Sequence, residues 1–125
     1  MTNYQVGDFL IRVKNAANAG LKNVEMKSTN HIKAVADALQ KTGFLSEVSE
    51  ENGLLIASLT MKSKKPVLED LKVISKPGLR VYADTKILEK RRSPSILLLS
   101  TSKGIVSSKE ALKERIGGEV IVEVW

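Results

Sequence analysis

The sequence predicts an α+β protein of two small domains: an N-terminal domain in the order α-β-α-β-β, and a mainly β C-terminal domain with one short helix. Three observations predict this class. Apolar residues recur at helical spacing in two early segments, an Asn-Gly pair separates two strand-like segments, and a polar run with a proline interrupts the pattern near residue 62. The 125 residues include no cysteine, so the chain must fold without disulfides, and its length allows this.

Two amphipathic helices are expected in the N-terminal half, with a short strand over residues 23–26 between them. The first follows the candidate N-caps Thr2 and Asn3 and ends before Gly20, while the second follows the polar run 28–30 and ends near Gly43. Their buried faces are expected to comprise Val6, Phe9, Leu10, Val13 and Ala17 in the first helix, and Ile32, Val35, Ala36 and Leu39 in the second.

A hairpin is expected to complete the N-terminal domain. Strands over 44–50 and 54–61 flank Asn52-Gly53, a pair that suits the two positive φ angles of a type I′ turn. The polar run 62–66 then marks the expected boundary, because its proline favours an extended connection. The domains are therefore assigned to residues 1–62 and 66–125.

The C-terminal domain is expected to consist mainly of strands, over 67–74, 79–82, 96–100 and 119–125. Pro77-Gly78 suits a type II turn between the first two strands. In the closing strand, alternation predicts Val120, Val122 and Val124 on one side, with Ile121 and Trp125 on the other.

The remaining C-terminal segments are a basic loop and one short helix. Residues 90–95 have the composition of a mobile basic loop, and Pro94 would end any helix begun near Thr85. Ser107 and Glu110 have the spacing of a capping box, so a helix is expected to run to about Arg115 and to end at Gly117-Gly118.

The net charge of +6 is concentrated in one part of the sequence. Residues 1–60 contain 6 basic and 6 acidic residues, residues 61–92 contain 10 and 4, and residues 93–125 contain 4 and 4. A local excess of this kind indicates a basic surface rather than a charge spread for solubility. It favours a polyanionic partner.

Enzyme motifs are absent from the sequence: it has no phosphate-binding loop, dinucleotide-binding fingerprint, nucleophile elbow or zinc-protease motif. His31 is the one histidine, and the carboxylate pairs 50–51 and 69–70 are expected at exposed positions. We therefore expect no catalytic residues, no metal and no cofactor. The longest apolar runs, such as 96–99, fall far short of the ~20 residues of a membrane span, so a soluble cytoplasmic protein is expected.

The strongest binding candidate is Ser100-Thr101-Ser102-Lys103-Gly104, which follows an apolar strand. Its hydroxyls can bond to phosphates, ribose hydroxyls and base edges, and its glycine permits a tight turn. The same run also suits an ordinary polar turn. Lys76 and Arg80 flank the Pro-Gly turn, and Tyr82 is either a stacking ring or a half-packed strand residue.

Two further groups of polar residues are weaker candidates. Arg12, Lys14 and Asn15 lie beside the apolar stripe of the first helix and either reach a partner or form a solvated face. Arg91 and Arg92 belong to the basic loop and could add phosphate contacts.

Several of these motifs resemble the family of ribosomal protein eight of the bacterial small subunit. The run 100–104, then Gly117-Gly118-Glu119-Val120-Ile121 and the terminal Val124-Trp125, is similar to the family's C-terminal signature. Residues 73–82 resemble its central segment, and the N-terminal half agrees more loosely, at Asp8, 12–16, Met26 and 43–45. The sequence departs from the family at 91–95, where a glycine-rich turn is usual, and around Lys27 and Asn30.

The resemblance implies a non-enzymatic protein that binds the central domain of small-subunit rRNA through Ser100, Thr101, Ser102, Lys103 and Gly104, with Lys76, Arg80, Tyr82 and Glu119 nearby. It also implies neighbouring small-subunit proteins as partners, and a location in the small subunit of a cytoplasmic or organellar ribosome. Some members of the family repress translation of their own mRNA, a possibility that stays open for this chain. The alternatives from the residues alone are a module that docks an acidic protein and a minor enzyme of nucleotide metabolism.

Overall fold

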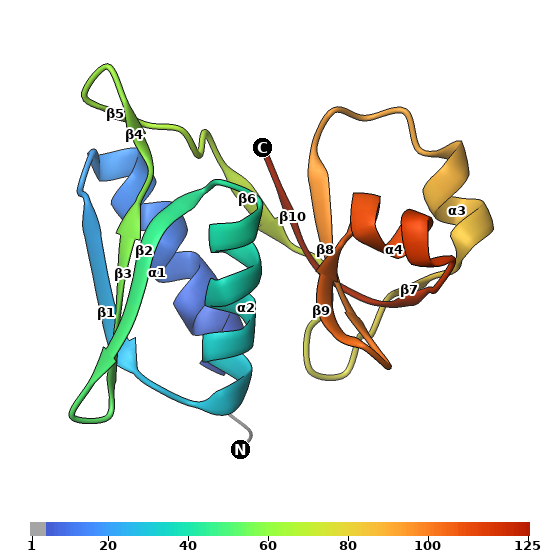
Figure 1. Cartoon of the computed structure of the whole chain (residues 1–125), viewed down its shortest axis with the longest axis horizontal. Coiled ribbons are helices and arrows are strands. Elements are labelled where there is room, and N and C mark those ends of the chain that lie inside the picture. The colour runs from blue at the N-terminus through green and yellow to red at the C-terminus, as the bar shows by residue number, and fades with distance from the viewer. Residues whose placement is uncertain (1–4) are drawn as a thin grey trace. The chain divides into compact units, whose positions relative to one another are not determined.

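The computed structural model describes residues 5–125, so the candidate caps Thr2 and Asn3 lie outside it. Its contacts divide the chain into two compact units, one ending at Asp70 and the other formed by Leu71–Trp125. Both units combine helices with antiparallel strands, which confirms the α+β class (Figure 1). The expected domain boundary at 62–66 stays a prediction.

The first unit has the predicted order α-β-α-β-β. Its elements are α1 (Gln5–Ala19), β1 (Asn23–Lys27), α2 (Asn30–Lys41), β2 (Leu45–Glu51) and β3 (Leu54–Leu59). The strands form an antiparallel sheet in the order β1-β3-β2. Helices α1 and α2 pack against each other and against this sheet, as Figure 1 shows.

Local signals explain most of these elements. The Thr29 hydroxyl accepts a hydrogen bond from the Ile32 amide at 3.2 Å, which caps α2. Asn52 and Gly53 have φ angles of 52° and 80°, which confirms the predicted type I′ turn. The predicted apolar faces of both helices are buried, except that Ala17 is half-buried and its neighbour Ala16 is buried instead.

A second, unpredicted hairpin follows β3 in the first unit. It pairs β4 (Met61–Lys62) with β5 (Lys65–Pro66). Its turn residues Ser63 and Lys64 both have positive φ angles, of 53° and 66°, a conformation that most residues other than glycine and asparagine disfavour. Their residue types therefore gave no turn signal. Residues 67–70, expected as strand, are irregular.

The second unit contains a larger antiparallel sheet. Its elements are β6 (Leu71–Val73), β7 (Tyr82–Ala83), α3 (Thr85–Lys90), β8 (Ile96–Thr101), β9 (Gly104–Ser107), α4 (Ser108–Glu114) and β10 (Gly118–Val124). The strand order is β6-β10-β8-β9, and the short β7 also pairs with β10. The expected strands 67–74 and 79–82 are thus much shorter than predicted.

The two helices of the second unit have clear N-caps. The Asp84 carboxylate accepts from the Ile87 amide at 2.9 Å and starts α3, a helix missing from the predicted architecture. The Ser107 hydroxyl accepts from the Glu110 amide at 3.2 Å, as predicted for α4. Helix α4 ends at Glu114, and the next residue, Arg115, has a φ of 56° and is the left-handed cap in place of the expected glycines.

The core of the second unit lies on one face of its sheet. It contains Ala83, Leu88, Leu97, Leu99, Val106, Ala111 and Val120. An irregularity in register occurs between Val120 and Val122, so these two residues face the adjacent β8 residues Leu99 and Leu98. Leu98 and Leu99 are adjacent in β8 and therefore point to opposite faces of the sheet. Val120 and Val122, which pair with them, also point to opposite faces. The expectation that they share one side was wrong.

Within residues 5–125, we find no helix with the length and apolar character needed to cross a membrane.

Candidate functional site

The hydroxyl run 100–104 forms the tight connection between β8 and β9. Thr101 pairs with Gly104 across the ladder, and Ser102 and Lys103 lie exposed at the tip. The Thr101 hydroxyl donates to the Gly104 carbonyl oxygen at 2.8 Å and accepts from the Lys103 amide at 3.1 Å. The Thr101 hydroxyl therefore holds the turn together. Ser102 and Lys103 are the residues best placed to reach a partner.

The glycine pair before β10 allows β10 to lie very close to its neighbours. A Cβ atom on Gly118 would lie 2.2 Å from the Ser100 carbonyl oxygen, and one on Gly117 would lie 2.5 Å from the Ala83 carbonyl oxygen. Neither position tolerates a side chain without a backbone shift. The predicted role of these glycines in ending α4 is thus replaced by a role in strand packing.

This close packing aligns three candidate residues in one row across the sheet. Glu119 lies opposite Tyr82 on β7 and opposite Ser100 on β8. Residues directly opposite each other in an antiparallel ladder point to the same face. Their chain neighbours Ala83, Leu99 and Val120 belong to the core cluster, so the row faces away from that core. Tyr82 is 66% exposed, which leaves its ring available for stacking.

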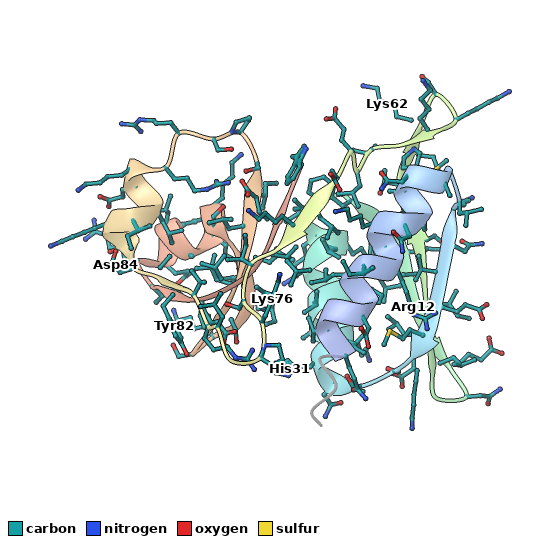
Figure 2. All side chains as sticks on the ribbon, turned by 180° about the vertical axis from the view of Figure 1, so that it is seen from behind. Arg12, His31, Lys62, Lys76, Tyr82 and Asp84 are labelled. Carbon is teal, nitrogen blue, oxygen red and sulfur yellow. The ribbon has the colours of Figure 1, made fainter. Side chains whose placement is uncertain are left out.

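The segment between β6 and β7 carries Lys76 and Arg80 beside this row. Gly78 has a φ of 84°, and backbone hydrogen bonds of 2.9 Å join Lys76 and Leu79 in both directions, which confirms the predicted type II turn. Arg80 donates to the Glu119 carboxylate at 3.2 Å. Lys76 and Tyr82 both project from residues 75–83, as labelled in Figure 2.

A buried hydroxyl joins the two ends of this segment. Ser75 is fully buried, and its hydroxyl accepts from the Val81 amide at 2.9 Å and donates to the Val81 carbonyl oxygen at 3.3 Å. Val81 in turn accepts at its carbonyl oxygen from the Val120 amide, at 2.8 Å. Ser75 thus positions the loop that carries Lys76 and Arg80, without being exposed itself.

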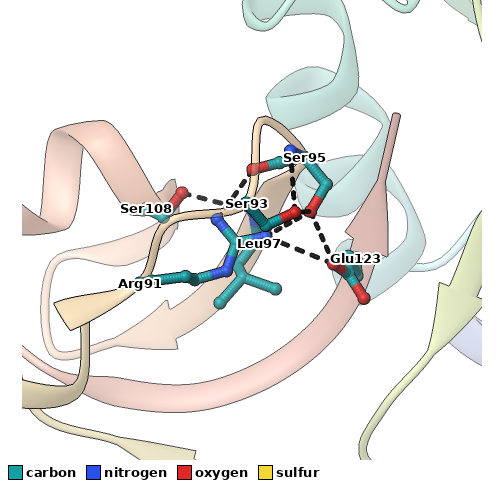
Figure 3. A network of polar contacts seen from close by, with 6 residues as sticks. All are labelled: Arg91, Ser93, Ser95, Leu97, Ser108 and Glu123. Carbon is teal, nitrogen blue, oxygen red and sulfur yellow. Dashed lines mark hydrogen bonds and ion pairs between the residues drawn. The ribbon is translucent and has the colours of Figure 1, made fainter. Parts of the chain in front are cut away.

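The basic loop 90–95 is held by a polar network rather than left free (Figure 3). The Arg91 guanidinium donates to the Ser95 carbonyl oxygen at 2.7 Å and lies 3.3 Å from the Glu123 carboxylate. The Ser95 hydroxyl also bonds to Glu123. Arg91 is therefore engaged within the second unit, whereas the neighbouring Arg92 is exposed and its guanidinium makes a contact of 3.5 Å to the Glu89 carbonyl oxygen.

Lys103, at the tip of the turn, forms an ion pair with α4. Its Nζ lies 2.8 Å from the Glu114 carboxylate oxygen. The hydrogen bond from Lys103, together with its positive charge, lowers the pKa of Glu114 below its ordinary value. The negative charge of this carboxylate thus opposes the positive charge of Lys103.

The candidate residues of α1, which are Arg12, Lys14 and Asn15, belong to the first unit. All the other candidate site residues belong to the second unit. Arg12 and Asn15 are exposed and line a shallow groove of about 380 Å³ together with residues from β1. Lys14 is half-exposed and forms an ion pair with Asp70 at 3.5 Å.

No group of three His, Asp or Glu side chains suited to a metal ion occurs in residues 5–125, and His31 is exposed. Sequence reasoning missed Ser75, Glu114 and Glu123, whose roles depend on partners 6, 11 and 32 residues away along the chain. Glu114 lies on the last turn of α4, outside the capping box of Ser107 and Glu110.

Comparison with known proteins identifies the family. The model of the family described as ribosomal protein S8 matches residues 5–125. The chain is 41% identical to small ribosomal subunit protein uS8 of Finegoldia magna over 96% of each chain, and 35% identical to uS8 of Trichormus variabilis over 98% of each. It is 39% identical to uS8c of Guillardia theta over the full length of both. The chain therefore belongs to the ribosomal protein S8 family, whose members are non-enzymatic structural components of the small ribosomal subunit.

Proposed function

We propose that this protein binds small-subunit rRNA directly and helps to organise the central domain of that RNA during assembly. The observation that carries the proposal is the row Tyr82, Glu119 and Ser100, which adjoins the exposed hydroxyl turn and faces away from the core cluster. The row combines a stacking ring, a carboxylate acceptor and a hydroxyl. These groups suit an irregular RNA helix.

The chemistry of the turn favours recognition of shape over recognition of sequence. A regular A-form helix hides its base edges in a deep major groove, so proteins read 2′-hydroxyls in the minor groove or bases freed at irregularities. The Ser102 hydroxyl is exposed and can both donate and accept a hydrogen bond. Small side chains and Gly104 let the backbone of the turn come close to the RNA.

The charge distribution supports the second unit as the main RNA-binding part. Residues 71–125 contain 11 basic and 6 acidic residues, whereas residues 1–70 contain 9 and 8. The excess charge thus lies with the hydroxyl turn, where it would attract phosphate and make binding dependent on salt. Exposed Lys76 and Arg92 are the candidate phosphate contacts at its edges.

The α1 residues supply a smaller, separate contact in this proposal. Arg12 and Asn15 are exposed and line the groove beside β1. The charge of Lys14 is partly neutralised by its ion pair with Asp70. An RNA segment with similar irregularities in the protein's own mRNA would bind the same hydroxyl turn, and translation would then be repressed. The competing explanation, docking of an acidic protein on the basic surface, makes no use of the hydroxyls.

Filter binding of the purified protein tests this function. The RNAs are a central-domain fragment of small-subunit rRNA and a scrambled RNA of equal length, at ~0.15 M salt, where non-specific complexes have dissociation constants of about 10⁻⁴–10⁻⁶ M. We expect the rRNA fragment to bind at least about tenfold tighter than the scrambled RNA. Equal affinity for the two RNAs would contradict the proposal.

A further inference from the structure

Two cations of the candidate site, Lys103 and Arg80, are each opposed by a carboxylate. Lys103 on the turn pairs with Glu114 of α4 at 2.8 Å, and Arg80 pairs with Glu119 of β10 at 3.2 Å. Lys76 and Arg92 have no carboxylate within ion-pair distance among residues 5–125. Carboxylates thus partly neutralise Lys103 and Arg80 but not Lys76 and Arg92.

The Lys103–Glu114 ion pair is exposed to solvent, so it contributes little energy and can be broken by another anion. The side chains of Lys103 and Glu114 are 59% and 43% exposed, so water and salt screen their attraction. A phosphate that approaches Lys103 must either displace Glu114 or share the ammonium group with it. In either case the nearby carboxylate, on the last turn of α4, repels the phosphate.

We propose that Glu114 competes with RNA phosphate for Lys103 and thereby limits the affinity of the site for RNA. This inference rests on the proposed function, because it assumes that Lys103 contacts RNA. The opposite role is a positioning one, in which Glu114 holds the Lys103 ammonium group in a geometry that the RNA needs. Removing the charge of Glu114 separates the two roles, because competition predicts tighter binding and positioning predicts weaker binding.

Glu114→Gln is a suitable variant for this test. The amide oxygen of glutamine still accepts a hydrogen bond from Lys103, so only the charge is lost. The residue is exposed on the last turn of α4, away from the Ser107 cap, so the fold should persist. Glu110→Gln is the matched control: Glu110 lies on the same helix, is exposed, and has no ion-pair partner within residues 5–125, and the substitution changes the net charge equally.

The experiment measures dissociation constants for the central-domain fragment and the scrambled RNA at several salt concentrations. We expect Glu114→Gln to bind both RNAs about two- to fivefold tighter than the wild type, with a salt slope steeper by up to about one. Glu110→Gln should give a clearly smaller gain. In a Lys103→Ala background, Glu114→Gln should give no gain beyond that of Glu110→Gln, because the competed cation is absent.

Three results would overturn the inference: weaker or unchanged binding by Glu114→Gln, an equal gain in Glu110→Gln, or a full gain in the Lys103→Ala background. Failure of the proposed function has a different signature, because the wild type would then not distinguish the rRNA fragment from the scrambled RNA. A wild type that discriminates, combined with a Glu114→Gln variant that does not tighten, rejects the competition alone.

Discussion

Gly118 approaches Ser100 so closely that a Cβ atom on the glycine would lie 2.2 Å from the Ser100 carbonyl oxygen. The obstacle is backbone, so it cannot be relieved by moving a side chain. Ser100 begins the hydroxyl turn, and Glu119 next to Gly118 completes the row with Tyr82. The glycine therefore links strand packing to the geometry of the proposed RNA site.

The variant Gly118→Ala tests this link. The added methyl group must push β10 away from β8, which should lower the free energy of unfolding by about 1–3 kcal/mol. Urea denaturation measures the loss, and NMR amide shifts of residues 100–104 report the change in the turn. Wild-type stability together with an unchanged turn would show that the close approach has no consequence.

Ser75→Ala should weaken RNA binding from a buried position. The substitution leaves the Val81 amide without its 2.9 Å partner, which should cost about 1 kcal/mol of stability and loosen residues 76–81. Faster hydrogen exchange at Val81 and a lower affinity for the rRNA fragment are the expected results. Ser75→Thr keeps the hydroxyl as a comparison, and an Ala variant with wild-type exchange at Val81 would contradict the assignment.

The neighbouring arginines of the basic loop should behave differently. Arg91→Ala removes the bonds to Ser95 and Glu123 and should destabilise the second unit by about 1–2 kcal/mol. Arg92→Ala should leave stability unchanged but reduce the salt slope of RNA binding by about one. Thermal melts and filter binding of both variants measure these effects. Equal changes in stability and in salt slope for the two substitutions would contradict the different roles of Arg91 and Arg92.

The pKa of Glu114 supplies a pH-dependent prediction. Because Lys103 lowers this pKa in the folded protein below the ordinary value of 4.5, the pair contributes to stability above that value and loses its contribution as pH falls through the folded-state pKa. In Lys103→Met the pKa of Glu114 should rise toward 4.5. An NMR titration of the Glu114 carboxyl group follows the change, and equal pKa values in both proteins would exclude the pair in solution.

Local signals in the sequence were sufficient for much of the fold. Asn52-Gly53, Pro77-Gly78 and the Ser107 cap each act within a few residues, so their residue types alone predict the structure. The Ser63-Lys64 turn carries no such signal, because neither residue favours a positive φ. The irregular register beside Val120 escaped prediction because it depends on how β10 pairs with β8.

The exposed residues of the candidate site could be predicted from the sequence, but the residues that hold them in place could not. The hydroxyl turn and Tyr82 were identified from residue type and order. Ser75, Glu114 and Glu123 act through partners brought together by the sheet and by α4, which no local pattern reveals. Arg91 shows the converse, because its charge suggested a ligand contact while the structure engages it with Ser95 and Glu123.

The central claim is that charge attracts RNA and that the hydroxyl turn selects it. The most direct test is the ratio of the protein's affinity for the central-domain fragment to its affinity for a regular RNA duplex. This ratio is measured by filter binding for the wild type, Ser102→Ala and Lys103→Ala. We predict that Ser102→Ala lowers the ratio severalfold, because it removes a positioned contact and no charge, whereas Lys103→Ala weakens both complexes and preserves the ratio. Equal losses on both RNAs for Ser102→Ala would contradict the account.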